Sequence, residues 1–323
     1  MLTGILAGLG AGALWGLVFV VPRITPGLSA VDVTAGRFIS FGAVSALAML
    51  LALRTRRLPS LHQAMAALGM SVLGFTGYYL LLALAIQDAG TEAPTLIIGA
   101  IPIWMMLLGK PLGLTWKSLA PGIVLTLGGL ALMMAANFGV DMSAAHLPDT
   151  TSTLAPTQGQ TQNLPGLSHA NHPRYWRGIG CALAAMLSWT AFGLINSAWL
   201  KRNAEVNATD WANWLGVATG LGAALLWFAA GSEAKVLLAL DNIAYLATIC
   251  IVTGVGSAWL ATILWNLASQ RLSASLCGQM IVGETIFALV YSYAWDAQWP
   301  GMLQATACIL FILGILASIR AHR

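Results

Sequence analysis

Charged residues are scarce in this sequence. Lys, Arg, Asp and Glu make up 8% of the 323 residues, and hydrophobic residues make up 58%. Soluble domains carry about 25% charged residues, so the composition excludes an ordinary soluble domain and predicts an all-α membrane protein. The formal net charge of +4 does not indicate nucleic-acid binding, because ten of the fifteen Lys and Arg fall in short gaps between apolar runs.

Paired cysteines and catalytic motifs are also missing. The four cysteines lie inside apolar runs without C-x-x-C spacing, which is typical of small buried residues. No H-E-x-x-H, G-x-S-x-G or G-x-x-x-x-G-K-[ST] sequence occurs, so neither a hydrolase centre nor an ATPase is indicated. We therefore expect no enzyme activity, no catalytic residue, no metal and no cofactor. The first apolar run has no basic residue before Arg23 and is expected to be a retained span.

Ten apolar runs are long enough to cross a bilayer as helices. Five precede and five follow a polar segment, and because five is odd, the second half enters the membrane from the opposite side. The predicted fold is ten transmembrane helices as two inverted five-helix repeats, at residues 1–140 and 177–323. The predicted spans are 2–21, 31–53, 64–86, 92–109, 118–138, 178–199, 211–230, 243–267, 272–294 and 301–319.

Residues 141–176 differ in composition from the rest of the chain. They are rich in Thr, Gln, Pro, Ser and Asn and contain few aromatic residues, so they are expected to form a disordered extracytoplasmic linker. His146, His169 and His172 in this segment offer metal ligands. A flexible, proline-bearing segment holds such ligands poorly, so a metal site is the less favoured interpretation.

The distribution of Lys and Arg predicts the orientation. With the N-terminus inside, ten fall on the inner side and five on the outer side, which places both termini in the cytoplasm. The inner ten are Arg54, Arg56, Arg57, Lys110, Lys117, Lys201, Arg202, Arg271, Arg320 and Arg323, and the outer five are Arg23, Arg37, Arg174, Arg177 and Lys235.

Glu284 is the deepest acidic residue in the sequence. It lies at the centre of the apolar run 272–295. A charged group in the middle of a bilayer costs roughly 3 kcal/mol, so such residues usually face a wet cavity or a bundle interior. Glu284 is therefore a candidate to carry a proton and contact a substrate. The alternative is a protonated acid that hydrogen-bonds a neighbouring helix and serves packing alone.

Four aromatic residues, Trp15, Tyr78, Trp189 and Trp259, lie near the centres of their spans. A Trp at this depth either fills the core or lines a cavity, because the membrane interface is its usual place. Pro102, near the middle of the fourth span, is expected to bend the helix and free carbonyl groups. We expect these five residues to converge on the deep acid at mid-membrane and form the substrate-binding site.

Arg37 lies about two helical turns inside the outer end of the second span. Its long side chain can extend toward the surface. It is interpreted either as an anchor that pairs with Asp32 or a lipid phosphate, or as an outer gate that attracts anions.

Weak self-similarity links the two halves. Residues 11–20 align with 185–194, which pairs Trp15 with Trp189, and residues 83–102 align with 264–285, which pairs Pro102 with Thr285. With these features the chain resembles the drug/metabolite transporter superfamily, specifically its EamA-type ten-helix carriers. The residues that carry the resemblance are Leu14-Trp15-Gly16, Arg37, residues 93–102, Gly128-Gly129 and Glu284-Thr285.

The sequence departs from this family's pattern in three places. Thr285 replaces a frequent proline, Lys110 and Lys117 stand where an acid often follows the fourth span, and the segment between the halves is long. The resemblance still implies export or exchange of a small metabolite across a bacterial inner membrane.

The expected function is a secondary transporter that exports or exchanges an amino-acid-like or amphipathic solute by alternating access, with proton coupling through Glu284. One alternative is a membrane-embedded subunit of a larger transport complex, or a sensor, without transport activity of its own. A membrane enzyme is the least favoured class. The expected partners are a small-molecule substrate and the lipid bilayer, with no nucleic acid, and the protein is expected to be a monomer or homodimer.

Overall fold

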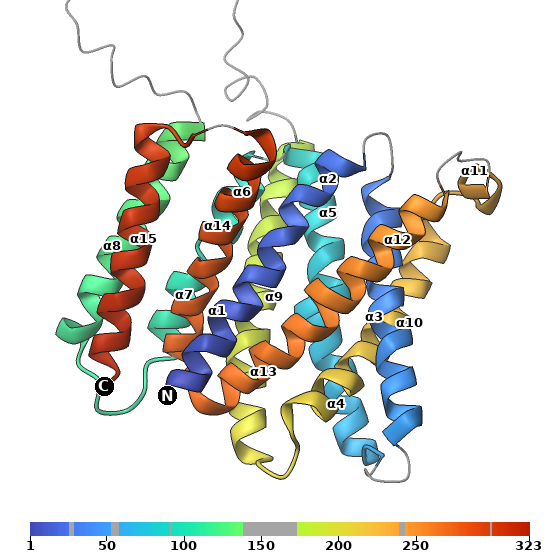
Figure 1. Ribbon diagram of the computed structural model, residues 1–323, viewed down its shortest axis with the longest axis horizontal. Coiled ribbons are helices and arrows are strands. Elements are labelled where there is room, and N and C mark those ends of the chain that lie inside the picture. The colour runs from blue at the N-terminus through green and yellow to red at the C-terminus, as the bar shows by residue number, and fades with distance from the viewer. Residues whose placement is uncertain (26–28, 53–57, 91, 138–172, 239–242, 298) are drawn as a thin grey trace, which may run out of the picture.

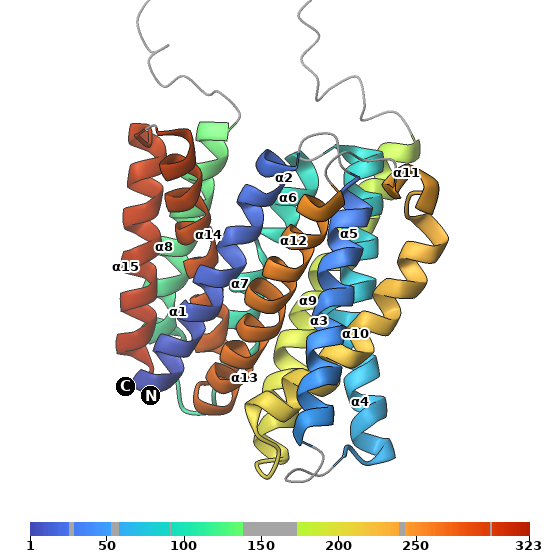
Figure 2. The same cartoon turned by 45° about the vertical axis from the view of Figure 1, so that its right-hand side comes forward.

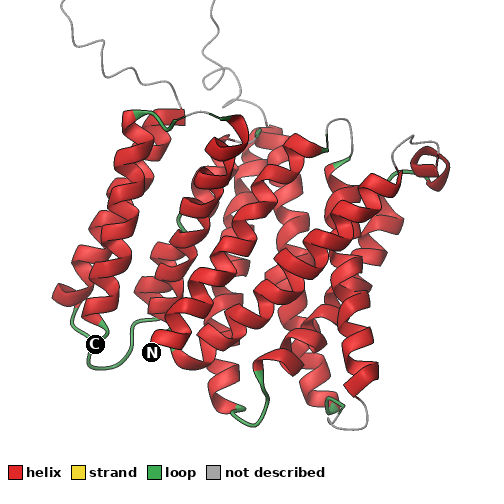
Figure 3. Cartoon of the chain, in the orientation of Figure 1, coloured by secondary structure: helices red, strands yellow, loops and turns green. Residues whose placement is uncertain are grey.

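The computed structural model describes residues 1–25, 29–52, 58–90, 92–137, 173–238, 243–297 and 299–323. All regular secondary structure in these residues is helical (Figure 3). Most of the expected linker at 141–176, including its three histidines, lies outside the described residues. Its last four residues are helical, so that boundary was placed too late.

The first half contains α1, which continues into η1 and α2, and then α3. A third helix, α4 and α5, is interrupted by η2, and the short pair α6 and α7 precedes α8. Their bounds are α1 (Leu2–Gly16), η1 (Leu17–Val20), α2 (Val21–Ile24), α3 (Ala30–Ala52), α4 (Leu61–Ser71), η2 (Val72–Thr76), α5 (Gly77–Ala89), α6 (Glu92–Ile98), α7 (Ile101–Leu108) and α8 (Trp116–Asn137). The second half contains α9 (Pro173–Arg202), α10 (Ala208–Ala230), α11 (Ala234–Leu238), α12 (Ile243–Thr253), η4 (Gly254–Leu260), α13 (Ala261–Arg271), α14 (Ala274–Asp296) and α15 (Met302–Ala321).

Nine helical stretches within the described residues are long and apolar enough to cross a membrane. The fourth predicted span is the exception, because its apolar helix, Ala93–Leu108, is shorter. The chain is therefore an all-α protein of multi-pass character. A tenth full-length span stays a prediction.

The fourth span is interrupted at its middle. α6 ends at Ile98, and α7 starts at Ile101 with Pro102 in its first turn. Proline has no backbone N–H, so it cannot donate to the carbonyl four residues earlier, and it favours the start of a helix over its interior. The interruption expected at Pro102 is present.

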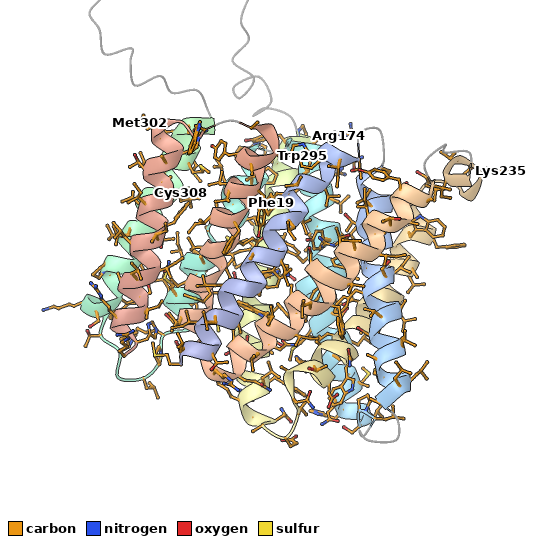
Figure 4. All side chains as sticks on the ribbon, viewed as in Figure 1. Phe19, Arg174, Lys235, Trp295, Met302 and Cys308 are labelled. Carbon is orange, nitrogen blue, oxygen red and sulfur yellow. The ribbon has the colours of Figure 1, made fainter. Side chains whose placement is uncertain are left out.

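The helices form one bundle in which partners come from opposite halves of the chain (Figures 1 and 2). α3 packs along α10, α8 along α15, and α5 along α9, while α1 lies against α13 and α14. The N- and C-terminal ends lie at the same end of the bundle. Arg174, Trp295 and Met302 lie at the opposite end (Figure 4).

Glycines bring α1 and α14 into backbone contact. Four of them, Gly4, Gly8, Gly12 and Gly16, repeat every fourth residue and face α13 and α14. A Cβ atom at Gly12 would lie 2.9 Å from the backbone N of Glu284, and one at Gly16 would lie 2.9 Å from the N of Ala288. Small residues of this spacing allow close helix approach in membranes, and here they hold α1 beside the deep acid.

Candidate substrate site

Glu284 lies in α14 where the surroundings of the helix change. Residues 275–280, toward the end of the bundle that holds the termini, are all buried. Residues 284–287 are all partly exposed, and four consecutive residues cover every face of a helix. The inner part of α14 is thus closely packed, whereas the turn that carries Glu284 is partly exposed.

The Glu284 carboxylate has no hydrogen-bond or ion-pair partner among the residues that the structure describes. A protonated acid retained for packing would donate to a neighbouring helix, and no such acceptor contacts it there. Its backbone, by contrast, is fixed against α1 through Gly12 and Gly16. The backbone of Glu284 is therefore fixed, while its carboxylate is left without a partner in the described part of the chain.

Three tryptophans from α1, α9 and α13 meet beside this position. The ring centroids of Trp15 and Trp189 are 6.2 Å apart. Trp265 completes the cluster at 5.4 Å from Trp15 and 5.7 Å from Trp189. Trp15 and Trp189 are half-buried, and Trp265 is buried. We call these three residues the tryptophan cluster.

Sequence reasoning missed Trp265. Trp259 lies near the centre of the predicted span 243–267, whereas Trp265 lies close to its end, so depth favoured Trp259. The structure separates them: Trp259 donates its indole N–H to the Oδ1 of Asn213 at 2.8 Å. It makes no ring contact with the tryptophan cluster in the described part of the chain.

Phenylalanines connect the tryptophan cluster to α3 and α5. Ring centroids are separated by 5.9 Å from Trp189 to Phe192, 5.5 Å from Phe192 to Phe75, and 6.0 Å from Phe75 to Phe38. A further step of 5.0 Å joins Phe38 to Tyr79. Aromatic pairs at these separations attract one another beyond the burial of their area. The result is a continuous aromatic wall from α1 to α5.

Arg37 points into the bundle at the far end of this wall. It is 7% exposed, and its Nη2 donates to the Tyr79 hydroxyl at 2.8 Å. Its guanidinium carbon lies 4.6 Å from the Phe38 ring centroid and 5.3 Å from that of Tyr79. The interpretation of Arg37 as an anchor paired with Asp32 is wrong, because Asp32 instead accepts from the Trp227 indole at 3.0 Å and the Ser232 backbone at 2.9 Å.

Tyr78 is near both Arg37 and Glu284. It is buried, with its ring centroid 5.1 Å from that of Tyr79. The charges of Arg37 and Glu284 both act on its hydroxyl group. The sequence identified Tyr78 but not Tyr79, because two adjacent tyrosines on a helix give no sign of which one meets the buried arginine.

Pro102 is near α14 but apart from the tryptophan cluster. It is buried, and a Cβ atom added at Gly278 would lie 3.1 Å from its carbonyl oxygen and 2.5 Å from the Cβ of Met105. Pro102 therefore contacts the buried inner part of α14 and not the turn that carries Glu284. The structure thus brings Trp15 and Trp189 into ring contact and Tyr78 near Glu284, whereas Pro102 contacts the inner part of α14 and Trp259 binds Asn213.

Two buried polar networks lie outside the predicted set. Asn196 accepts from the Trp211 indole at 2.7 Å and donates to Asn266 at 3.1 Å, which joins α9, α10 and α13. On α14, Gln279 donates to Thr126 at 3.1 Å, and Ser318 donates to Gln279 at 3.1 Å. These groups satisfy one another, which is how polar side chains are accommodated in a dry bundle. They fix the helices that carry the site.

No group of three or more His, Cys, Asp or Glu side chains that could hold a metal ion occurs among the described residues.

Comparison with known proteins relates the chain to transporters. Residues 2–135 match the EamA-like transporter family. Over 341 aligned residues the chain is 27% identical to inner membrane protein YtfF of Escherichia coli K12, with 99% of this chain and 96% of that protein covered. One solved crystal structure superposes with a TM-score of 0.72 at 18% identity, covering 99% of this chain and 98% of the other, and shows the same fold. The resemblance to EamA-type carriers is confirmed.

Proposed function

We propose, from the match to the EamA-like transporter family, that this chain is a secondary transporter that exports or exchanges an amino-acid-like or amphipathic solute. The observation that carries the proposal is a half-buried carboxylate at mid-span, without a partner in the described residues, beside a cluster of three tryptophans. Trp15, Trp189 and Tyr78 would contact the solute, with Pro102 and Trp259 at the border of the site. Glu284 would bind the solute or a proton.

An inverted repeat is supported by the helix contacts. If the first five spans are exchanged with the last five, the pairs α3 with α10 and α8 with α15 map onto themselves. The pair α5 with α9 maps onto α13 with α1, and both pairs are in contact. The third and eighth spans each contain a π-helical turn, η2 and η4. Two halves related in this way can exchange conformations, which is the basis of alternating access.

Differences in packing along the helices support a site open toward one end. Near the termini, Ser275 donates its backbone N–H to the Gly109 carbonyl at 3.1 Å and its hydroxyl to the Met106 carbonyl at 3.0 Å. Gly278 in the same stretch packs on Met105. This contact between α7 and α14 would close the terminal end, while the turn at Glu284 is partly exposed. Transport would require the contact to open.

The proposed location is a bacterial inner membrane, as in the name of the related protein YtfF. The proposed orientation places both termini in the cytoplasm. In the structure, Lys110 follows α7, and α9 and α13 end in Lys201, Arg202 and Arg271. All three helices end at the same end of the bundle as the termini, which agrees with an excess of positive charge inside. A monomer or homodimer in the lipid bilayer is proposed as the working unit.

Reconstitution tests the function. Purified protein in liposomes should catalyse uptake of a labelled amino acid or aromatic amine from a panel, above the rate of protein-free liposomes. Accumulation should increase with an imposed pH gradient if a proton is coupled. If the folded protein by itself moves no solute in the panel, the alternative of a subunit of a larger complex or a sensor is favoured instead.

A further inference from the structure

We infer that Arg37 and Tyr79 form a binding subsite for the carboxylate group of the transported solute. The inference rests on the proposed transport function and narrows its substrate class. It predicts that the protein selects solutes with a carboxylate over amphipathic amines that lack one.

The first argument is the hydrogen-bonding state of Arg37. An arginine carries several N–H donors, arranged in a planar fork. In the described part of the chain, the Tyr79 hydroxyl is the one acceptor that Arg37 contacts, and the buried Nε has no partner. A buried guanidinium with unused donors is costly unless an acceptor completes it. Carboxylates match this fork best, because both oxygens accept in one plane.

The second argument is the missing counterion. Asp32, five residues before Arg37 on the same helix, is already bound by Trp227 and Ser232. Glu284 is close enough to interact electrostatically with Arg37, but no ion pair joins the two side chains in the described residues. The positive charge is therefore buried without a contacting anion, so a mobile anion would stabilise it strongly.

The third argument is the approach that the surroundings allow. The rings of Phe38 and Tyr79 lie at 4.6 Å and 5.3 Å from the guanidinium carbon. Aromatic rings at such distances attract a guanidinium by cation–π interaction, but they do not neutralise its positive charge. The aromatic wall continues from Phe38 to the tryptophan cluster. The phenylalanines of this wall are buried, whereas Tyr79, Trp15 and Trp189 are partly exposed. A solute bound by its carboxylate at Arg37 would thus place its apolar part against Tyr79 and the tryptophan cluster, with its other end toward Glu284.

Matched probes test the subsite by direct binding to the purified full-length protein in nanodiscs. The set is 3-phenylpropionate, phenethylamine and phenylalanine, together with indole-3-propionate, tryptamine and tryptophan. We expect the carboxylate-bearing probes to bind and the two amines to bind at least about tenfold more weakly, because a hydrogen-bonded charge contact is lost. Equal binding of amines and carboxylates, or no binding of any carboxylate in the set, would overturn the inference.

Variants separate recognition from a structural role. Arg37→Gln should weaken carboxylate binding by about 10- to 100-fold and leave amine binding unchanged, while Arg37→Lys should keep part of the carboxylate preference. Tyr79→Phe should weaken carboxylate binding by less, since only the Tyr79 hydroxyl is removed and the charge of Arg37 remains. Arg271→Gln, in an exposed arginine at the end of α13, is the matched control and should change nothing. Equal loss for amines and carboxylates in Arg37→Gln would mean that Arg37 only supports the fold.

The outcome is distinguishable from failure of the proposed function. Carboxylate-selective binding without flux in liposomes would uphold the subsite and refute the transporter. Flux of carboxylate-bearing solutes that is unaffected by Arg37→Gln would uphold the transporter and refute the subsite.

Discussion

At the scale of single residues, Glu284 combines features that rarely occur together. It is an acid in the middle of a membrane span, its backbone is fixed by Gly12 and Gly16, and its carboxylate is unpartnered in the described chain. A group of this kind costs free energy when charged in an apolar medium. It therefore changes its charge readily when a proton or a cationic ligand arrives, which suits a coupling residue.

Substitution of Glu284 tests this role. Glu284→Gln keeps the size of the neutral acid and should fold normally and exchange solute, but accumulation driven by a pH gradient should fall to the level of protein-free liposomes. Glu284→Ala should lose exchange as well if the carboxyl contacts the solute. Both fluxes are measured in liposomes at matched protein content. Unchanged pH coupling in Glu284→Gln would assign the residue to packing.

Single residues also show where sequence reasoning stops. Trp15, Trp189 and Glu284 could be selected from depth in a span and from the repeat, and the structure brings them into one region. Trp265 lies close to the end of its predicted span and has no repeat partner, so neither criterion selects it. The orientation of Arg37 depends on Tyr79 in another helix, and no local pattern in the sequence encodes that partner.

At the scale of helices, the glycines of α1 determine how close α14 can approach. Gly12→Ala would place a methyl group 2.9 Å from the backbone N of Glu284, and a backbone atom cannot rotate away. We expect a loss of about 1–3 kcal/mol in stability from overpacking, together with slower transport. Thermal unfolding in detergent and flux in liposomes measure the two effects.

Gly180→Ala is the matched control, because nothing lies within 4 Å of a Cβ atom at that helical glycine. It should be neutral or stabilising by up to about 1 kcal/mol, from helix propensity alone. Equal effects of the two substitutions would show that the α1–α14 approach is not critical.

The π-helical turn η2 is stabilised from a neighbouring helix. The Ser188 hydroxyl on α9 donates to the Leu73 carbonyl at 2.8 Å, and such turns interrupt the regular hydrogen bonds of a helix. Ser188→Ala should therefore destabilise the protein by about 1 kcal/mol, measured by thermal unfolding. Thr248→Ala removes a hydroxyl that bonds only within its own exposed helix turn and should have little effect. If both variants unfold alike, the bond to η2 contributes nothing.

Helix positions were predictable from apolar length, but helix ends and interruptions were less so. The sixth span was expected to start at residue 178 and starts at Pro173. Its first turn is polar, yet Arg177 forms an ion pair with Asp88 of α5 at 2.5 Å, a contact between residues far apart in the sequence. The turns η2 and η4 contain no proline, so these two interruptions could not be predicted from a proline in the sequence. Pro102, by contrast, marked its interruption directly.

At the scale of the whole molecule, the orientation in the membrane follows from charge and can be tested with single cysteines. Leu112 and Trp299 are both highly exposed and lie in loops at opposite ends of the bundle. In a variant whose four native cysteines are replaced by alanine, Trp299→Cys should react with an impermeant maleimide in intact cells, and Leu112→Cys should react only after lysis. The reverse pattern would invert the orientation.

The overall architecture was the most predictable level. An all-helical membrane bundle follows from hydrophobic runs of bilayer length, because such helices satisfy every backbone hydrogen bond internally. Nine of the predicted spans reappear as long apolar helices in the described chain. The fourth is shorter, Ala93–Leu108, even when it is counted across the interruption at Pro102.

The shared location of the two chain ends has a consequence for connectivity. Both ends lie side by side at one end of the bundle, while α8 finishes and α9 begins at the other (Figures 1 and 2). A circular permutant that joins residue 323 to residue 1 by a short linker, and opens between α8 and α9, would start with the second half. Epitope tags at its new ends should be accessible in intact cells, and the permuted protein should still bind solute. The order in which the halves are synthesised would then matter less than the contacts between them.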